Sequence, residues 1–211
     1  ISEATRESLI HISGESRDTI VVIPNPVPPG YTERPKQMAD RPRILQIGTA
    51  PHKNLERTVE AINGLDVHFR IIGKLSETQR SLLDGLEIDF SSIDYVDDRS
   101  MLEEYIAADI VVFCSLFEGF GMPIIEAQAI GRLVVTSDRS PMREVAGSGA
   151  LLVDPEDVSS IRQGIETLIS KPDVAENYRR AGVKNAEAFH VSTIADQYLE
   201  LYQEIFAYSK S

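Results

Sequence analysis

The chain has 211 residues, 42% of them hydrophobic and 26% charged, which is enough for one well-buried globular domain and argues against a disordered protein. Its formal net charge of −12 disfavours nucleic acid and an anionic bilayer as direct partners, because both would repel it. No apolar run approaches the ~18 residues of a transmembrane helix, and the first residues form no secretory apolar core. The single cysteine, Cys114, excludes an internal disulfide and a cysteine-cluster zinc site, so the expected compartment is the cytosol.

The first forty residues indicate the end of one structural unit and a linker. A short capped helix is expected over Ser2 to His11 and a strand over Thr19 to Ile23. The proline-rich stretch from Pro24 to Gly30 predicts a stiff, extended connector. Because the chain starts at Ile1 without an initiator methionine, we expect it to be an internal piece of a longer protein.

From Arg43 onward, short β-branched runs alternate with amphipathic segments, which predicts a parallel, doubly wound α/β sheet. Asn54 is the expected cap of a helix over Leu55 to Ile62, and Ser100 that of a helix over Met101 to Ala108. A further helix reaching Ser170 is expected to open at Asp157 or Ser159. The six expected strands are residues 44–47, 67–72, 88–95, 110–114, 133–136 and 150–153.

Ligands of such sheets bind outside the carboxyl ends of the strands. Four loops should gather at that edge, and they span residues 49–53, 73–74, 116–122 and 137–140. A small phosphate compound needs only a local positive pocket there, which the acidic chain as a whole does not preclude. The candidate cations are His52, Lys53, Lys74, Arg139 and Arg143.

The segment Ser115 to Gly131 carries the strongest chemical signal, because an expected strand leads through a glycine-rich turn into a helix. Gly119 and Gly121 would allow a sharp turn and the close approach of a ligand, and Pro123 suits the first helical position. The N–H groups of Met122, Ile124 and Ile125, together with the helix dipole, would attract a phosphate group.

Two glutamates flank this turn. Glu118 lies in it and Glu126 lies inside the helix, and a carboxylate at each place could accept hydrogen bonds from vicinal sugar hydroxyls. On the residues alone, Glu126 could equally be a glutamate that only interacts with the helix dipole.

Glu118 and Glu126, enclosing Gly-Phe-Gly-Met-Pro, resemble the paired-glutamate motif of family 4 retaining glycosyltransferases. The resemblance extends from about Ser2 to Phe206. Three further segments carry it: an interdomain linker from Ile23 to Val27, a first phosphate loop from Gly48 to Leu55 and a later loop from Asp138 to Val145. That family has the GT-B fold, in which two Rossmann-like domains face each other and the C-terminal one binds the sugar nucleotide. The resemblance implies that residues 1–40 are the end of the N-terminal domain and the linker, 41–190 the nucleotide-sugar-binding domain, and 191–211 a helix crossing back to the first domain.

The resemblance also implies roles for individual residues. Lys53 would neutralise the donor diphosphate as the sugar leaves, Glu118 would bind hydroxyls of the donor sugar, and Glu126 would bind the ribose hydroxyls. Thr49 departs from the many members that have arginine there, and His52 replaces an arginine frequent in the closer branch. The other implied donor-binding positions are Gly73, Val96, Gly119, Phe120, Gly121, Met122 and Ile124.

Several alternatives stay open at this point. Lys53 could be an exposed lysine before a helix, and Arg139 and Arg143 could face the site or pair with Glu144 on the surface. Lys74 is a weaker candidate, since the family's common Gly-Asp-Gly-Pro sequence is absent after Gly73. His11, His68 and His190 lack the spacing of a metal site or a catalytic triad, so we interpret them as structural.

The expected function is the binding of a UDP-sugar, with UDP-glucose slightly ahead of GDP-mannose, for transfer to a saccharide or lipid-linked saccharide acceptor in polysaccharide synthesis. No metal and no cofactor are expected, and the acceptor and any peripheral contact with the inner face of the membrane would belong to the N-terminal half. The isolated fragment is therefore expected not to transfer sugar. The alternatives are a non-catalytic sugar-nucleotide-binding module and a nicotinamide enzyme, the latter disfavoured because no Gly-x-Gly-x-x-Gly follows Leu45.

The last segment adds an apolar stripe at helical spacing after the sheet is complete. We expect this stripe to be exposed in the isolated chain, together with the apolar residues Leu9, Ile10 and Ile12. The stripe consists of Ile194, Tyr198, Leu201, Tyr202 and Ile205.

Overall fold

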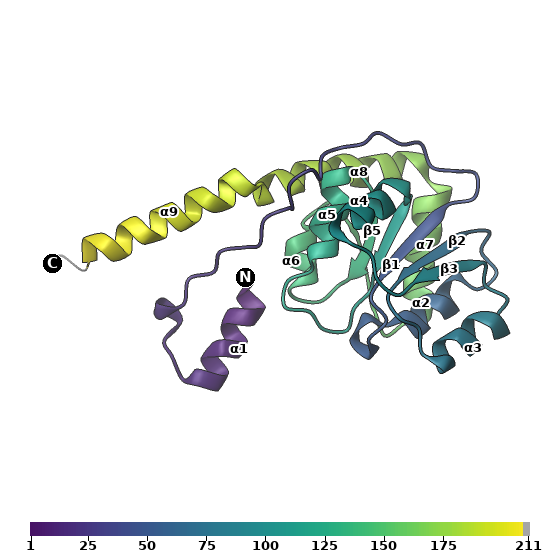
Figure 1. The fold of residues 1–211 in the computed structure, drawn as a ribbon, viewed down its shortest axis with the longest axis horizontal. Helices are drawn as coiled ribbons and strands as arrows, with labels where there is room; N and C mark the ends of the chain where they lie inside the picture. The colour runs from purple at the N-terminus through teal and green to yellow at the C-terminus, as the bar shows by residue number, and fades with distance from the viewer. Residues whose placement is uncertain (209–211) are drawn as a thin grey trace.

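A parallel sheet of six strands, with helices on both faces, forms the body of the molecule in the computed structural model, which describes residues 1–208 (Figure 1). The spatial order is β3-β2-β1-β4-β5-β6, and every neighbouring pair is parallel. All six strands predicted from the sequence are present, so the doubly wound α/β class is confirmed. The strands are β1 Arg43–Ile47, β2 His68–Ile72, β3 Phe90–Ile93, β4 Ile110–Phe113, β5 Leu133–Ser137 and β6 Leu151–Val153.

Alternation along the strands divides the core into two layers. On β4, Ile110 and Val112 face one layer while Val111 and Phe113 face the other, and all four are at most 2% exposed. The first layer packs against α2 Leu55–Ile62, α3 Glu77–Gly85 and α7 Val158–Ser170. The second packs against α4 Asp98–Ala107, α5 Met122–Ile130 and α6 Met142–Ala146, and α8 Pro172–Ala186 contacts α5 and α7.

Cys114 follows β4 and is fully buried in the first layer. Burial raises the pKa of its thiol well above the ordinary cysteine value, because the thiolate would lose its hydration. It therefore serves as a small apolar residue, as expected.

The helix starts show which capping predictions were right. Asp157 caps α7 by accepting from the N–H of Ser159. The prediction of Ser100 as a cap was wrong, because the helix begins earlier: Asp97 caps α4 and accepts from the N–H of Ser100 at 2.7 Å. Asn54 does precede α2, but it makes no side-chain capping bond: its Oδ1 accepts from a guanidinium N–H of Arg57 at 2.9 Å, and its Nδ2 donates to the carbonyls of Cys114 and Pro155.

The N-terminal segment differs from expectation in one element. The predicted capped helix is present as α1 Glu3–Ser13, with Ser2 as its cap. The predicted strand from Thr19 to Ile23 is wrong: Arg17–Thr19 form a 3₁₀ turn and residues 20–28 have no regular structure. A strand needs a partner to satisfy its N–H and C=O groups, and this segment pairs with neither β3 nor β6, the edges of the sheet.

The C-terminal helix α9 Val191–Tyr208 projects from the body, and α1 lies on the same side of the molecule (Figure 1). Ile194 is 3% exposed where α9 leaves the domain, but Tyr202 and Ile205 are 61% and 57% exposed further along. The predicted exposed stripe is therefore present at Tyr198, Tyr202 and Ile205, and Leu9 and Ile12 on α1 are exposed as well. The prediction was wrong for Ile194, which is buried, while Leu201 and Ile10 are half-buried. None of the helices within residues 1–208 has the length and apolar character needed to cross a membrane.

Candidate functional site

The loops predicted to share one rim do follow the carboxyl ends of β1, β2, β4 and β5. The strand order reverses between β1 and β4, so the loops after these two strands border the crevice where ligands bind in such sheets. They are joined directly, because the N–H of Leu116 donates to the carbonyl oxygen of His52 at 2.8 Å. The two motifs predicted separately therefore form one surface.

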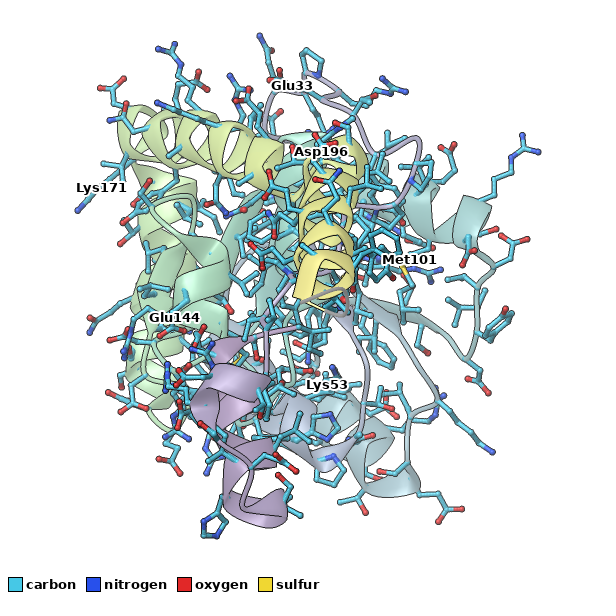
Figure 2. The ribbon with its side chains drawn as sticks, turned by 90° about the vertical axis from the view of Figure 1, so that its left-hand side faces the viewer. Glu33, Lys53, Met101, Glu144, Lys171 and Asp196 are labelled. Atoms are coloured by element: carbon cyan, nitrogen blue, oxygen red, sulfur yellow. The ribbon has the colours of Figure 1, made fainter. Side chains whose placement is uncertain are left out.

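Lys53 and Glu118 meet on this surface as an ion pair. Lys53 Nζ lies 2.6 Å from Glu118 Oε1, and the two side chains are only 20% and 13% exposed. Figure 2 is drawn from the side on which α1 and α9 project, and Lys53 is labelled on this side beside α1. The site thus contains a cation and a carboxylate that are partly shielded from water and hold each other in place.

Two residues fix the course of the Lys53 side chain. Gly48 has a φ of +89°, and a Cβ atom there would lie 2.8 Å from Cγ of Lys53, so only glycine lets the lysine stem cross its backbone. At the far end, the ammonium lies 4.8 Å from the centre of the Phe113 ring, within the range of a cation–π contact. Lys53 is therefore a packed residue and not a freely exposed lysine.

The start of α5 presents backbone N–H donors, but it differs in detail from what the sequence predicted. Pro123 occupies the second helical position, after Met122, and only Gly121 of the two turn glycines has a positive φ, +114°. Ile124 was expected to offer a free N–H, but its N–H donates to Gly121 O at 3.0 Å because the first turn tightens there. Among the described residues, the N–H groups of Phe120 and Met122 have no acceptor, whereas Ile125, which was also expected to offer a free N–H, lies inside the first turn of the helix.

The turn itself is held from outside by α1. The Ser2 hydroxyl lies 2.7 Å and the Thr5 hydroxyl 3.0 Å from the carbonyl oxygen of Gly119. The C=O and the following N–H point in opposite directions across a trans peptide. The contact with α1 therefore directs the N–H of Phe120 away from α1.

Glu126 lies in a different environment from Glu118. Its Oε2 accepts a hydrogen bond from the hydroxyl of Tyr105, a residue that is fully buried on α4. Desolvation raises the pKa of Glu126, the Tyr105 hydrogen bond opposes this, and repulsion by Asp98 adds to the rise. Burial and the nearby charge of Glu126 also raise the pKa of Tyr31, whose ring packs edge-on against Tyr105 with centroids 5.6 Å apart.

The weaker donor-binding candidates differ in what they can offer. The Thr49 hydroxyl donates to Lys74 O at 2.7 Å, and its methyl group would lie 3.0 Å from a Cβ on Gly73, so Thr49 and Gly73 pack together. His52 is exposed and contributes its carbonyl to the loop contact described above. Val96 is half-buried in the loop before α4.

The remaining cations point to the surface. Lys74 is exposed, Arg139 pairs with Glu156, and Arg143 pairs with Asp138. The surface interpretation of both arginines was right, but Glu144 as their partner was wrong, because Arg139 pairs with a carboxylate in the loop after β6 and Arg143 with one directly after β5. His68 likewise bridges Asp89 and Ser91, each at 2.8 Å, which fits a structural residue.

Sequence reasoning missed Ser2, Thr5 and Tyr105 as contributors to this site. Their signals were weak, since a serine and a threonine at a helix start are ordinary caps. The hydroxyl of Tyr105 is a single polar group on a helix face that is otherwise apolar, so the sequence gives little sign of its role. Within residues 1–208, no group of three or more His, Cys, Asp or Glu side chains is arranged to hold a metal ion.

The arrangement suits the recognition of a phosphorylated, hydroxyl-rich molecule. Backbone donors and an ammonium group stabilise negative charge, and two carboxylates of different exposure accept hydrogen bonds from hydroxyl groups. Together with the doubly wound sheet, these features define the class as a doubly wound α/β domain with a candidate anion-binding site at the strand ends.

Comparison with known proteins identifies the family of the chain. The profile of glycosyl transferases group 1 matches residues 32–186, and the chain belongs to this family. It is 28% identical over 200 residues to the phosphatidyl-myo-inositol mannosyltransferase of Mycobacterium leprae, covering 88% of this chain and 54% of that protein. The chain thus spans about half the length of this curated relative.

Solved structures agree on the fold. Sucrose-phosphate synthase from Thermosynechococcus elongatus superimposes with a TM-score of 0.82 at 20% identity, over 98% of this chain and 58% of that one. Anabaena HepE, solved in complex with UDP and glucose, superimposes with a TM-score of 0.83 at 19% identity, over 96% of this chain and 62% of that one. The chain thus has the fold of the matching part of GT-B glycosyltransferases.

Proposed function

We propose that this domain binds the nucleotide-diphosphate sugar donor of a retaining glycosyltransferase and stabilises the departing diphosphate. The observation that carries the proposal is the half-buried ammonium of Lys53, held by Glu118 in the loop that leads to the open N–H groups at the start of α5. A diphosphate placed there would meet an ammonium group, backbone donors and a helix dipole at once. Glu118 and Glu126 would then accept hydrogen bonds from the hydroxyl groups on either side of the diphosphate.

The roles follow from these positions. The bond between the anomeric carbon and the diphosphate oxygen breaks, and its electron pair remains on the diphosphate, where Lys53 and the start of α5 stabilise it. An acceptor hydroxyl oxygen bonds to the anomeric carbon from the same face, and its proton passes to the departing diphosphate oxygen. Glu118 would hold hydroxyls of the donor sugar and Glu126 those of the ribose, so neither is assigned as a nucleophile.

The donor is proposed as a UDP-sugar, with UDP-glucose first. The presence of UDP and glucose in the Anabaena HepE structure supports this choice. The mannosyltransferase activity of the Mycobacterium leprae relative supports GDP-mannose as the alternative. Transfer to a saccharide or lipid-linked saccharide, in the cytosol or at the inner face of the membrane, is proposed for the longer protein.

The acceptor site is proposed to lie in a second domain that faces this one across the crevice. The chain covers 54% of its Mycobacterium leprae relative, which leaves room for such a domain in a longer protein. We therefore expect the 211-residue chain to bind the donor without acceptor-dependent transfer. Transfer by this chain alone to any saccharide would contradict the two-domain proposal.

A non-catalytic sugar-nucleotide-binding module is the second candidate, and the Thr49 hydroxyl favours it to some degree. This hydroxyl is engaged by Lys74 O, so one side-chain donor that could assist a phosphate is occupied. Slow hydrolysis of UDP-glucose by the chain, reduced by Lys53→Ala, would favour the enzyme. Donor binding with no release of glucose would favour the module.

The decisive experiment is calorimetry with UDP, UMP, GDP and NAD. Glu126→Ala should weaken UDP and UMP by a similar factor, about 10- to 150-fold, because it removes charge-assisted hydrogen bonds worth roughly 1.5–3 kcal/mol. Lys53→Ala should weaken UDP more than UMP and should reduce the salt dependence of UDP binding. Lys171→Ala, at the exposed start of α8, is the control for loss of a lysine. Parent-like binding by both site variants would remove the assignment.

A further inference from the structure

Glu126 has one carboxylate oxygen engaged by the protein and one that is not. Oε2 accepts from the Tyr105 hydroxyl, and among the described residues Oε1 has no hydrogen-bond partner. The carboxylate is thus held from behind by a single donor and keeps one oxygen for another molecule. An exposed glutamate without such a contact would sample several rotamers and would lose that freedom on binding.

Tyr105 is itself immobilised at both ends. Its ring is fully buried between the sheet and α5 and packs edge-on against Tyr31. Its backbone carbonyl accepts from Nε of Arg132 at 3.1 Å, and Arg132 is only 4% exposed. The hydroxyl therefore has a fixed position, set by the packing of α4 and of the loop after α5.

We propose that Tyr105 is a positioning residue for ligand recognition: its hydroxyl holds Glu126 in the one orientation that turns Oε1 toward the ribose hydroxyls. This inference rests on the proposed function, in which Glu126 binds the ribose. Tyr105 touches no ligand itself and acts only through Glu126. A buried phenol suits this task, because it is neutral and donates one hydrogen bond in a fixed direction.

The contact also offsets part of the cost of placing a carboxylate at this half-buried position. Removal from water disfavours the charged form, and a donor to the charged form restores part of the lost stabilisation. Without the hydroxyl, Glu126 would have no protein donor and would turn toward solvent. The cost of returning it to the binding orientation would then appear as weaker ribose recognition.

The variant Tyr105→Phe removes the hydroxyl and keeps the ring and its packing. UDP should bind about 3- to 10-fold more weakly, as expected for one hydrogen bond of modest net worth. With 2′,3′-dideoxy-UDP, which lacks the hydroxyls that Glu126 would hold, the parent and Tyr105→Phe should bind equally. Tyr178→Phe, a half-buried tyrosine on α8 that packs against the other core layer, is the matched control and should change neither ligand.

A double-mutant cycle separates positioning from a structural role. In a Glu126→Ala background, Tyr105→Phe should cause no further loss of UDP affinity. The inference would be wrong if Tyr105→Phe weakened the binding of UDP and of dideoxy-UDP alike. It would also be wrong if Tyr105→Phe lowered the UDP affinity of the Glu126→Ala variant by its full factor, because the residue would then support the fold in general. If Glu126→Ala weakened UDP while Tyr105→Phe did not, the inference would fail and the proposed function would stand. If neither UDP nor GDP bound at all, the inference and the proposed function would both fail.

Discussion

At the scale of single residues, the ion pair between Lys53 and Glu118 changes what a lysine substitution means. Lys53→Ala removes a cation from the proposed diphosphate site and also leaves the Glu118 carboxylate, 13% exposed, without its partner. The unpaired carboxylate would repel an incoming diphosphate. The loss in Lys53→Ala is thus the sum of a lost attraction and a new repulsion.

The combination Lys53→Ala with Glu118→Gln tests this. We expect UDP affinity to fall about 10-fold or more in Lys53→Ala and to recover in part in the double variant, because glutamine is neutral. Calorimetry at low and high salt provides the measurement, and the salt dependence should be lowest for the double variant. Additive losses from the two substitutions would show that the pair does not interact energetically.

Glu126 gives a prediction about stability and pH. Its pKa is raised in the folded protein, chiefly by desolvation, so its contribution to folding is most favourable below the ordinary glutamate pKa and is lost as the pH rises through the folded value. Glu126→Gln keeps an oxygen that can accept from Tyr105 and carries no charge. The variant should therefore be more stable than the parent at neutral pH, and the difference should shrink toward about pH 4. Urea unfolding at both pH values measures this, and equal stability at neutral pH would contradict it.

Candidate site residues could be proposed from the sequence, but their contacts with one another and with Ser2, Thr5 and Tyr105 could not. The glycines, the lysine and the two glutamates follow from motif chemistry within short segments. The contact from Lys53 to Glu118 spans 65 residues and depends on how two loops are brought together, which local spacing does not encode. The Tyr105 hydrogen bond depends in the same way on the packing of α4 against α5.

At the scale of elements, α1 acts on the site although it lies outside the sheet domain. Ser2 and Thr5 both contact the carbonyl of Gly119, so we expect their joint replacement, Ser2→Ala with Thr5→Val, to loosen the Gly119–Phe120 peptide. UDP affinity should fall about 2- to 10-fold, as for one or two ordinary hydrogen bonds. Amide exchange at Phe120 should also become faster. Ser8→Ala is the control, because the Ser8 hydroxyl donates to Ala4 O within the same helix, and it should leave both quantities unchanged.

The six strands were predictable because each is a short β-branched run between amphipathic segments, and the sheet order follows from the doubly wound pattern. A strand prediction failed where the segment has no neighbouring strand to pair with. The apolar run at Thr19 to Ile23 has strand character, but no neighbouring strand lies beside it. The α4 boundary was missed because Asp97, Asp98 and Ser100 are all plausible caps, and sequence alone does not choose among them.

At the scale of the whole molecule, the outer face of α9 should make the isolated chain associate. Tyr198, Tyr202 and Ile205 are 42%, 61% and 57% exposed and follow one another at helical spacing. Apolar surfaces of this kind promote contacts between molecules. Sedimentation should show association that grows with concentration, and Tyr202→Glu with Ile205→Glu should reduce it. Asp196→Asn, on the same helix, is the control; a parent that stays monomeric at all concentrations would contradict the prediction.

The buried thiol of Cys114 has a practical consequence for following this protein in motion. It is the chain's single cysteine, it is fully buried, and its raised pKa keeps it protonated and unreactive toward alkylating dyes. A new cysteine at Tyr202, on the part of α9 that projects from the domain, would then be the one site that takes a fluorophore in the otherwise native chain. Emission from that position would test whether α9 moves when UDP is added, without any need to remove the native thiol first.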